Sequence, residues 1–258
     1  MAIRSILINV TDIARSVDFY TCFLGTRTLE VSDDAALLDA ETATLRLARV
    51  ESPEGTTWVA DDLQAGFRHV GFKVSDLDER VAALHAANVP FQLEPIHAEG
   101  DVRITFFYDP DGTLLELVEG PLQYHEVYDQ NAVDNDWGLG TPTQPRFDHV
   151  AETVSDLEVT KDYFGQFGYQ LMSGIHQPSD PRGFEINFLR AGDSSLEIFT
   201  YESAEKSQRA PQITAPGFVA AELDGVPPAS AERVGTAAGF ELYTDADGLV
   251  HALTTPES

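Results

Sequence analysis

The chain has 258 residues, enough for two domains that each bury a hydrophobic core. Its 43 acidic and 16 basic side chains give a formal net charge of −27. Nucleic acids and anionic membrane surfaces are bound through basic patches, so this charge argues against both as partners. The single cysteine, Cys22, excludes a disulfide within the chain. The first residues lack the apolar stretch of a signal peptide, and no apolar run is long enough to span a membrane, so we expect a cytoplasmic protein.

A short pattern of residues recurs along the chain. Val10-Thr11-Asp12-Ile13 begins one copy, Val74-Ser75-Asp76-Leu77 a second, and Val154-Ser155-Asp156-Leu157 a third, while a weaker copy begins near residues 218–223. In each clear copy a short alternating strand precedes a Ser-Asp or Thr-Asp pair, whose side chains are typical helix N-caps. Gly25 stands where the first helix would end with a positive φ. The pattern therefore indicates an internal repeat.

Strand-like runs and tight turns complete each copy. Asp109-Pro110-Asp111-Gly112 and Asp245-Ala246-Asp247-Gly248 are turn sequences, and the runs on either side of each predict a hairpin. We interpret the unit as strand–helix–strand–strand–strand, present four times, at residues 1–62, 63–120, 145–208 and 211–258. Residues 121–144 are rich in proline and glycine and predict a linker, which divides the chain into an N-terminal domain, 1–120, and a C-terminal domain, 145–258.

Two motifs resemble those of a known family. The pattern VxDxxxSxxFYxxxLG from Val10 to Gly25, and DPDGxxxE from Asp109 to Glu116, are similar to motifs of the vicinal oxygen chelate superfamily. That superfamily includes glyoxalase I, bleomycin-sequestering proteins and extradiol ring-cleaving dioxygenases. The resemblance implies an α+β fold, in which four βαβββ modules pair into two curved mixed-sheet cups. The fold hosts many reactions, so it does not specify one.

The resemblance also implies where a metal would bind, because the ligands in this family come from the first and last strand of a module. The first-strand positions are Ser5, His69, His149 and, in the loosely aligned fourth unit, Ala220 or Phe218. The last-strand positions are Arg46, Glu116, Glu197 and Ala252. Only the second and third units keep a histidine and a glutamate. We therefore expect these two units to share one metal-binding cup across the linker, with a degenerate cup formed by units one and four.

The proposed ligands His69, Glu116, His149 and Glu197 form an N2O2 set, which suits one divalent ion such as Zn, Ni, Co, Mn or Fe. Six-coordination would leave two adjacent positions for a small-molecule substrate with vicinal oxygens. By resemblance to glyoxalase I, Glu116 is expected to serve also as the catalytic base, with Glu197 as the alternative. Taken singly, each histidine is equally compatible with an ordinary buried residue, and Glu197 with an exposed strand position.

Further residues are candidates for the substrate pocket. Arg103, Tyr108, Phe199 and Tyr201 are expected to line it, although aromatic residues in strands more often belong to a core. On a chain of this charge an anionic substrate must be held locally, by the metal and by residues such as Arg46, Arg103 or Arg182. A monomer can already enclose a whole cup, so monomer and homodimer are both compatible with the sequence.

Three functions remain open from the sequence. The set of two histidines and two glutamates favours a metal-dependent lyase or isomerase of the glyoxalase type, which moves a proton through an enediolate-like intermediate. An Fe(II)-dependent extradiol-type dioxygenase is the first alternative, although such enzymes use two histidines and one carboxylate, and a fourth ligand occupies a position they need open. A non-enzymatic small-molecule binding protein is the second alternative, although such members commonly lack the ligands kept here.

Overall fold

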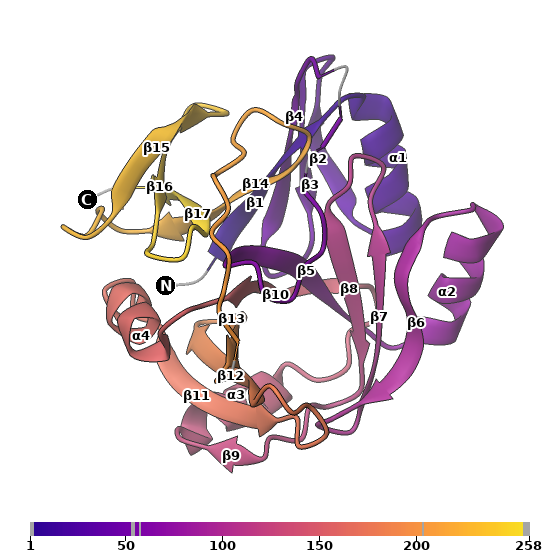
Figure 1. Cartoon of the computed structure of the whole chain (residues 1–258). Helices are drawn as coiled ribbons and strands as arrows, with labels where there is room; N and C mark the ends of the chain where they lie inside the picture. Colours follow the sequence, from indigo (N-terminus) through magenta and orange to yellow (C-terminus); the bar gives the residue numbers. More distant parts are fainter. Residues whose placement is uncertain (1–2, 53–54, 57, 203, 255–258) are drawn as a thin grey trace.

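The computed structural model describes residues 3–52, 55–56, 58–202 and 204–254, and it contains two large mixed sheets with four helices among these residues (Figure 1). We call them the outer-unit sheet, built from units one and four, and the inner-unit sheet, built from units two and three. The α+β fold with paired modules is confirmed.

The eight strands of the outer-unit sheet are β1 (Ile3–Val10), β2 (Arg27–Val31), β3 (Ala35–Asp39), β4 (Thr44–Arg49), β14 (Gly217–Asp224), β15 (Glu232–Ala237), β16 (Phe240–Thr244) and β17 (Val250–Thr254). The nine strands of the inner-unit sheet are β5 (Gly66–Val74), β6 (Phe91–Ala98), β7 (Val102–Tyr108), β8 (Leu114–Glu119), β9 (Glu126–Val127), β10 (Arg146–Thr153), β11 (Gln170–His176), β12 (Phe184–Ala191) and β13 (Ser194–Tyr201).

The two sheets have the same central arrangement. In the outer-unit sheet β1 pairs antiparallel with β14, and β4 and β17 flank this pair in parallel. In the inner-unit sheet β5 pairs antiparallel with β10, and β8 and β13 flank the pair in the same way. Each sheet thus takes strands from both sides of residues 121–144, which confirms the expected pairing of unit two with unit three. The division into domains 1–120 and 145–258 stays a prediction.

The helices begin where the sequence predicts. Asp12 and Asp156 accept hydrogen bonds from backbone amides in the first turns of α1 (Ile13–Leu24) and α4 (Leu157–Gly165), and Gly25 ends α1 in the left-handed conformation. The helix α2 (Leu77–Ala86) differs, because the side chain of Asp76 binds Arg80 instead of capping. Glu119 of the neighbouring strand β8 accepts the amide of Leu77 in its place.

Two parts of the chain differ from the expected order. The fourth unit has no helix between β14 and β15 among the described residues, and this connection contains Pro227-Pro228, which lack the amide hydrogens that a helix requires. The segment predicted as a linker contains the short strand β9 and the helix α3 (Gln130–Gly138), which Asp129 caps. β9 pairs with β11 at the edge of the inner-unit sheet. The segment therefore extends that sheet.

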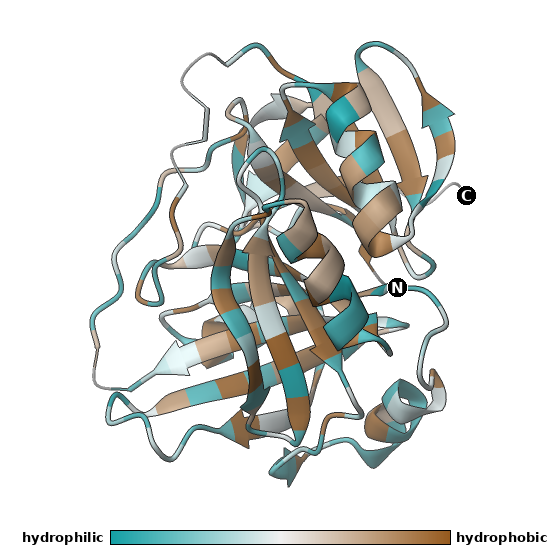
Figure 2. Cartoon of the chain, turned by 90° about the vertical axis from the view of Figure 1, so that its right-hand side faces the viewer, coloured by the Kyte–Doolittle hydropathy of each residue, from teal (hydrophilic) through white to brown (hydrophobic). Residues whose placement is uncertain are grey.

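The two Asp-x-Asp-Gly turns connect neighbouring units. Within each turn the first aspartate accepts amides of its own turn, as Asp109 does from Thr113 and Asp245 from Leu249. The second aspartate binds the unit before it, since Asp111 accepts the amide of Thr11 and Asp247 that of Ser155. These bonds join the two sheets. The convex faces of the sheets and the helices share the largest buried core of the described residues. The polar faces of the helices point outward (Figure 2). No helix in the described part of the chain is long and apolar enough to cross a membrane.

Candidate metal centre and adjoining cavity

Four side chains from the centre of the inner-unit sheet converge. His69 of β5 and His149 of β10 come from the central strand pair, and Glu116 of β8 and Glu197 of β13 come from the strands that flank it. All four residues are buried, with exposed fractions between 1% and 8%. Since residues of one parity line one face of a strand, the two pairs meet on the concave face of the sheet.

The ring nitrogens of the two histidines lie within 3.3 Å of a carboxylate oxygen of each glutamate. The two Nε2 atoms of His69 and His149 are 3.1 Å apart. Oε2 of Glu116 lies 3.2 Å from His69 Nε2 and 3.0 Å from His149 Nε2. Oε2 of Glu197 lies 3.2 Å and 3.3 Å from the same two nitrogens. His69 and His149 are therefore close enough to contact one ion, whereas widely separated imidazole rings would have excluded a shared site.

The electrostatics of the cluster favour a positive charge at its centre. Burial alone would raise the pKa of Glu116, but the neighbouring imidazoles of His69 and His149 outweigh burial and lower this pKa to about 2. Burial alone would lower the pKa of His149, but the neighbouring carboxylates of Glu197, Asp148 and Glu116 raise it well above its ordinary value. The two carboxylates thus stabilise a cation between them.

The residues fit a divalent metal ion. Their ligand atoms all lie within 4.8 Å of one another. Around an ion about 2.1 Å from each ligand atom, adjacent ligand atoms are separated by about 3.0 to 3.4 Å, which matches the observed separations. Glu116 Oε2 is buried and, among the described residues, accepts no hydrogen bond of good geometry although two ring nitrogens lie so close. The cluster could therefore hold a metal.

Gly71 makes room for one of the two imidazoles. It lies directly opposite His149 in the β5–β10 pair. A Cβ atom at this position would lie 2.1 Å from Cε1 and 2.3 Å from Nε2 of the His149 ring. A side chain at position 71 is therefore incompatible with the present orientation of His149.

A β-bulge precedes each histidine in the central strand pair. The register skips one residue just before His149 and one just before His69, and these extra residues are Asp148 and Arg68. A bulge changes the direction of neighbouring side chains, and here both extra residues line the same cavity as the ligands. Asp148 Oδ2 lies 2.9 Å from His149 Nδ1, so it can accept the proton of the ring nitrogen that faces away from the cluster.

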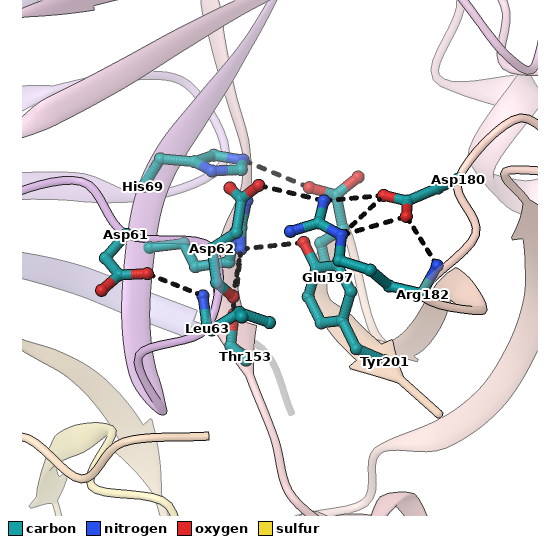
Figure 3. A network of polar contacts seen from close by, with 10 residues as sticks. Asp61, Asp62, Leu63, His69, Thr153, Asp180, Arg182, Glu197 and Tyr201 are labelled. Atoms are coloured by element: carbon teal, nitrogen blue, oxygen red, sulfur yellow. Dashed lines mark hydrogen bonds and ion pairs between the residues drawn. The ribbon is translucent and has the colours of Figure 1, made fainter. Parts of the chain in front are cut away.

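A cavity of about 620 Å³ adjoins the cluster. Glu116, His149 and Glu197 line it, together with aromatic side chains from β7, β12, β13 and the 121–144 segment, namely Phe106, Phe184, Phe188, Phe199, Tyr201, Tyr124 and Trp137. Phe199 and Tyr201, which the sequence analysis selected, are thus in its wall. Figure 3 shows Glu197, Tyr201 and His69 with the polar residues at one end of the cavity.

The other pocket candidates lie elsewhere. Arg103 and Tyr108 are not among the described residues that line the cavity. Arg103 pairs with Asp78 and Glu119 instead, because it has the opposite strand parity to its neighbours Ile104 and Phe106, which do line the cavity. Of the three arginines considered for an anion, Arg182 lines the cavity, while Arg46 binds Glu222 in the outer-unit sheet.

Four residues of the site were not predicted from the sequence, namely Arg68, Gly71, Phe106 and Asp148. Phe106 could have been found, since it pairs with Glu116 across the β7–β8 hairpin that the turn sequence predicts. Simple alternation would place Arg68 and Asp148 on the face opposite to the histidines, and no local signal reveals the bulges. The importance of Gly71 depends on the register with a strand nearly eighty residues away, which the sequence does not reveal.

Sequence comparisons support a relationship for the first part of the chain. A model described as the Glyoxalase/Bleomycin resistance protein/Dioxygenase superfamily matches residues 2–117. The uncharacterized protein YaeR of Escherichia coli (strain K12) is 44% identical over 54 residues, and the uncharacterized protein YwkD of Bacillus subtilis (strain 168) is 41% identical over 58 residues. Each match covers 21% of this chain and 42% or 43% of the relative, so the chain spans less than half the length of these curated relatives.

Solved structures match almost the whole chain. Glyoxalase I from Zea mays is similar with a TM-score of 0.67 and 17% identity, over 98% of this chain and 91% of that one. A putative dioxygenase from Bacillus subtilis subsp. subtilis str. 168 has a TM-score of 0.62 and 17% identity, over 100% of this chain and 86% of that one. At these identities the likeness shows the fold alone.

Proposed function

We propose that the chain, whose residues 2–117 match the Glyoxalase/Bleomycin resistance protein/Dioxygenase superfamily model, is a metal-dependent lyase or isomerase of the glyoxalase type. Its substrate would be a small molecule that presents two adjacent oxygens, and the reaction would move a proton through an enediolate-like intermediate. The observation that carries this proposal is the buried cluster of His69, Glu116, His149 and Glu197 beside a cavity large enough for such a molecule.

The four clustered residues would hold one divalent ion, and two neutral imidazoles with two carboxylates suit Zn, Ni, Co, Mn or Fe. When bound, the ion would supply Lewis-acid stabilisation of the negative charge that develops on the substrate oxygens. The aromatic wall of Phe106, Phe184 and Phe199, of which Phe199 is buried, would exclude water from the reacting atoms.

Glu116 is the residue that we assign to proton transfer. The resemblance to glyoxalase I supports this assignment, since a metal-holding glutamate is expected there to serve also as the base. Glu116 is buried and lines the cavity, where a carboxylate can take a proton from the carbon next to a substrate carbonyl. Glu197 remains the alternative base.

The proposal is tested by proton exchange at the α-carbon of dihydroxyacetone and related α-hydroxycarbonyls in D2O, followed by proton NMR with the metal-loaded protein. We expect Glu116→Gln to slow exchange by about 10²- to 10⁴-fold, the usual contribution of general acid–base catalysis. Glu222→Gln is the matched control, since Glu222 is an equally buried carboxylate in the outer-unit sheet. Full exchange activity in E116Q would refute the role of Glu116. A purified protein with no bound metal and no affinity for divalent ions would refute the proposed function.

A further inference from the structure

Two guanidinium groups lie along one wall of the cavity, beside the ligand cluster. Glu197, Phe199 and Tyr201 follow one another at alternate positions on the concave face of β13. The guanidinium carbon of Arg68 lies 4.2 Å from the centre of the Phe199 ring, and that of Arg182 lies 4.7 Å from the centre of the Tyr201 ring. At about 3.3 Å per residue, these rings are roughly 7 and 13 Å along the strand from Glu197.

A carboxylate of the protein itself lies between the two guanidinium groups. Asp62 Oδ1 accepts a hydrogen bond from Arg68 Nη2 at 3.0 Å, and Asp62 Oδ2 one from Arg182 Nη2 at 3.4 Å. Figure 3 shows this network of Asp62, Arg182, Thr153 and Tyr201, together with His69 and Glu197 of the ligand cluster. The geometry demonstrates that a carboxylate can be held at this place.

The two arginines are fixed independently of this aspartate side chain. Arg68 Nη1 donates to Thr153 Oγ1 at 3.0 Å and to the carbonyl of Asp62 at 3.1 Å, and Arg182 is paired with Asp180 through distances of 2.6 to 3.1 Å. The side chain of Asp62 is 51% exposed, whereas that of Arg68 is 16% exposed. Arg68 and Arg182 would keep these other contacts if the half-exposed Asp62 carboxylate were replaced by another carboxylate.

Arg68 also has a donor that none of the described residues uses. Its Nε atom is buried and has no hydrogen-bond partner among the described residues. A guanidinium binds a carboxylate best through two parallel N–H groups, and the N–H groups of Nε and Nη2 form such a pair. The side-chain carboxylate of Asp62 engages only Nη2 of Arg68, so a carboxylate that entered from the cavity could make one bond more.

From these contacts we propose that the substrate carries a carboxylate at the end remote from its two adjacent oxygens, and that Arg68, assisted by Arg182, binds this carboxylate in place of Asp62. The inference rests on the proposed function, because it takes the ligand cluster as the place where the adjacent oxygens bind. It narrows the substrate class to an elongated carboxylic acid, and it makes Asp62 an internal competitor that fills the carboxylate site when substrate is absent.

The test uses three two-oxygen chelators, of which the acid and its ester differ only in the remote group. Binding of acetohydroxamate, of the monohydroxamate of adipic acid, and of the methyl ester of that monohydroxamate is measured by calorimetry with the zinc-loaded protein. We expect the acid to bind at least about tenfold more tightly than its ester, as a charge-assisted hydrogen bond provides. Arg68→Met should bring acid and ester to equal affinity while acetohydroxamate still binds, and Asp62→Asn should increase the preference for the acid.

Controls separate this inference from general effects of charge and folding. Arg103→Met removes a positive charge on the other face of the sheet and should keep the full preference for the acid. Arg68→Lys keeps the charge but loses the paired N–H groups, so its preference should be intermediate. Equal affinity of acid and ester for the unmodified protein, or a preference that persists in R68M, overturns this inference alone. Failure of acetohydroxamate to bind the zinc-loaded protein overturns the proposed function and this inference with it.

Discussion

The two sheets place different side chains on nearly the same framework. The β5–β10 and β1–β14 pairs have matching registers, so Gly71 opposite His149 corresponds to Leu7 opposite Ala220. In the outer-unit sheet the corresponding ligand positions hold Ser5, Arg46, Ala220 and Ala252. The inner-unit sheet thus surrounds a polar cluster and a cavity, while the outer-unit sheet places an apolar cluster of Leu7, Val219, Ala220, Leu242, Val250 and Ala252 there.

One buried acid of the outer-unit sheet shows how the same framework is stable without metal ligands. Glu222 accepts hydrogen bonds from Ser5 and, at 2.6 Å, from Thr254, and its Oε2 lies 3.4 Å from Nε of Arg46. The charge of this buried carboxylate is therefore neutralised by side chains. The inner-unit sheet buries two carboxylates against two imidazoles instead. The fold therefore does not require the histidine–glutamate cluster, and this supports a functional reason for its presence in the inner-unit sheet.

The largest expected effect comes from removing one ligand. His149→Ala and His69→Ala should each lose the bound metal, because the cluster then keeps only three of its four ligands and one buried carboxylate loses its counter-charge. Ser5→Ala, at the corresponding position of the outer-unit sheet, should keep it. Elemental analysis of the purified variants measures this directly. A full metal complement in both histidine variants would remove the proposed difference between the sheets.

The second prediction concerns Gly71, which faces His149, and Leu7, which faces the corresponding Ala220 in the outer-unit sheet. Leu7 is 2% exposed in an apolar cluster, so Leu7→Ala should lower the free energy of unfolding by about 2–5 kcal/mol without changing metal content. Gly71→Ala should instead weaken metal binding, because its Cβ would meet the His149 ring. Denaturant unfolding and chelator competition measure the two effects. Loss of stability alone in both variants would contradict the proposed role of Gly71 in making room for a metal ligand.

These differences also show how far the sequence could predict the site. The first-strand and last-strand positions follow from motif spacing, so the convergence of His69, Glu116, His149 and Glu197 could be predicted from the family resemblance. The pairing of units two and three followed from the same residues. The fourth unit was expected to contain a helix although Pro227-Pro228 argue against one, so that error was avoidable.

Other features depend on contacts between distant strands and could not be predicted locally. The bulges at Arg68 and Asp148 arise from the register between β5 and β10, and a shift of one residue reverses the face on which a side chain lies. Arg103 was expected in the pocket, whereas strand parity relative to Phe106 places it on the opposite face. The alternation of side chains along a strand therefore predicts the correct face for Arg103, which lies in a regular strand, and the wrong face for Arg68 and Asp148, which lie at bulges.

The third prediction concerns the bulge residue before His149. Asp148→Ala should weaken metal binding by about 10- to 100-fold, because the ring would lose the acceptor that orients it. Asp148→Asn keeps an acceptor oxygen and should lose less. The corresponding residue of the outer-unit sheet is Val219, which has no such partner to orient. Zinc affinity is measured by competition with a chelator, and Glu99→Gln controls for the loss of one negative charge in the cavity. An equal loss in E99Q would assign the effect to charge alone.

The smallest expected effect concerns the convex side of the strands. Three residues after each first-strand position, β1, β5 and β14 carry the buried apolar residues Ile8, Phe72 and Leu223, whereas β10 carries Glu152, which is 0% exposed. Burial, followed by the proximity of Asp245, raises the pKa of Glu152 well above its ordinary value. The carboxyl is therefore protonated in the folded protein at a pH where the unfolded chain ionises it.

The sign of the pH dependence follows from this difference. Above the ordinary pKa of a glutamate, folding takes up a proton at Glu152, so this group lowers stability as the pH rises from about 4.5 toward its folded-state pKa. Glu152→Gln cannot ionise, so it should raise the thermal stability of the protein at pH 8 relative to the unmodified protein. The gain should vanish below pH 4.5, where the folded and unfolded states both carry the proton. Thermal unfolding of E152Q and the unmodified protein across this range measures it. A gain that is the same at pH 4 and pH 8 would show that packing, not ionisation, distinguishes β10 from the other three strands.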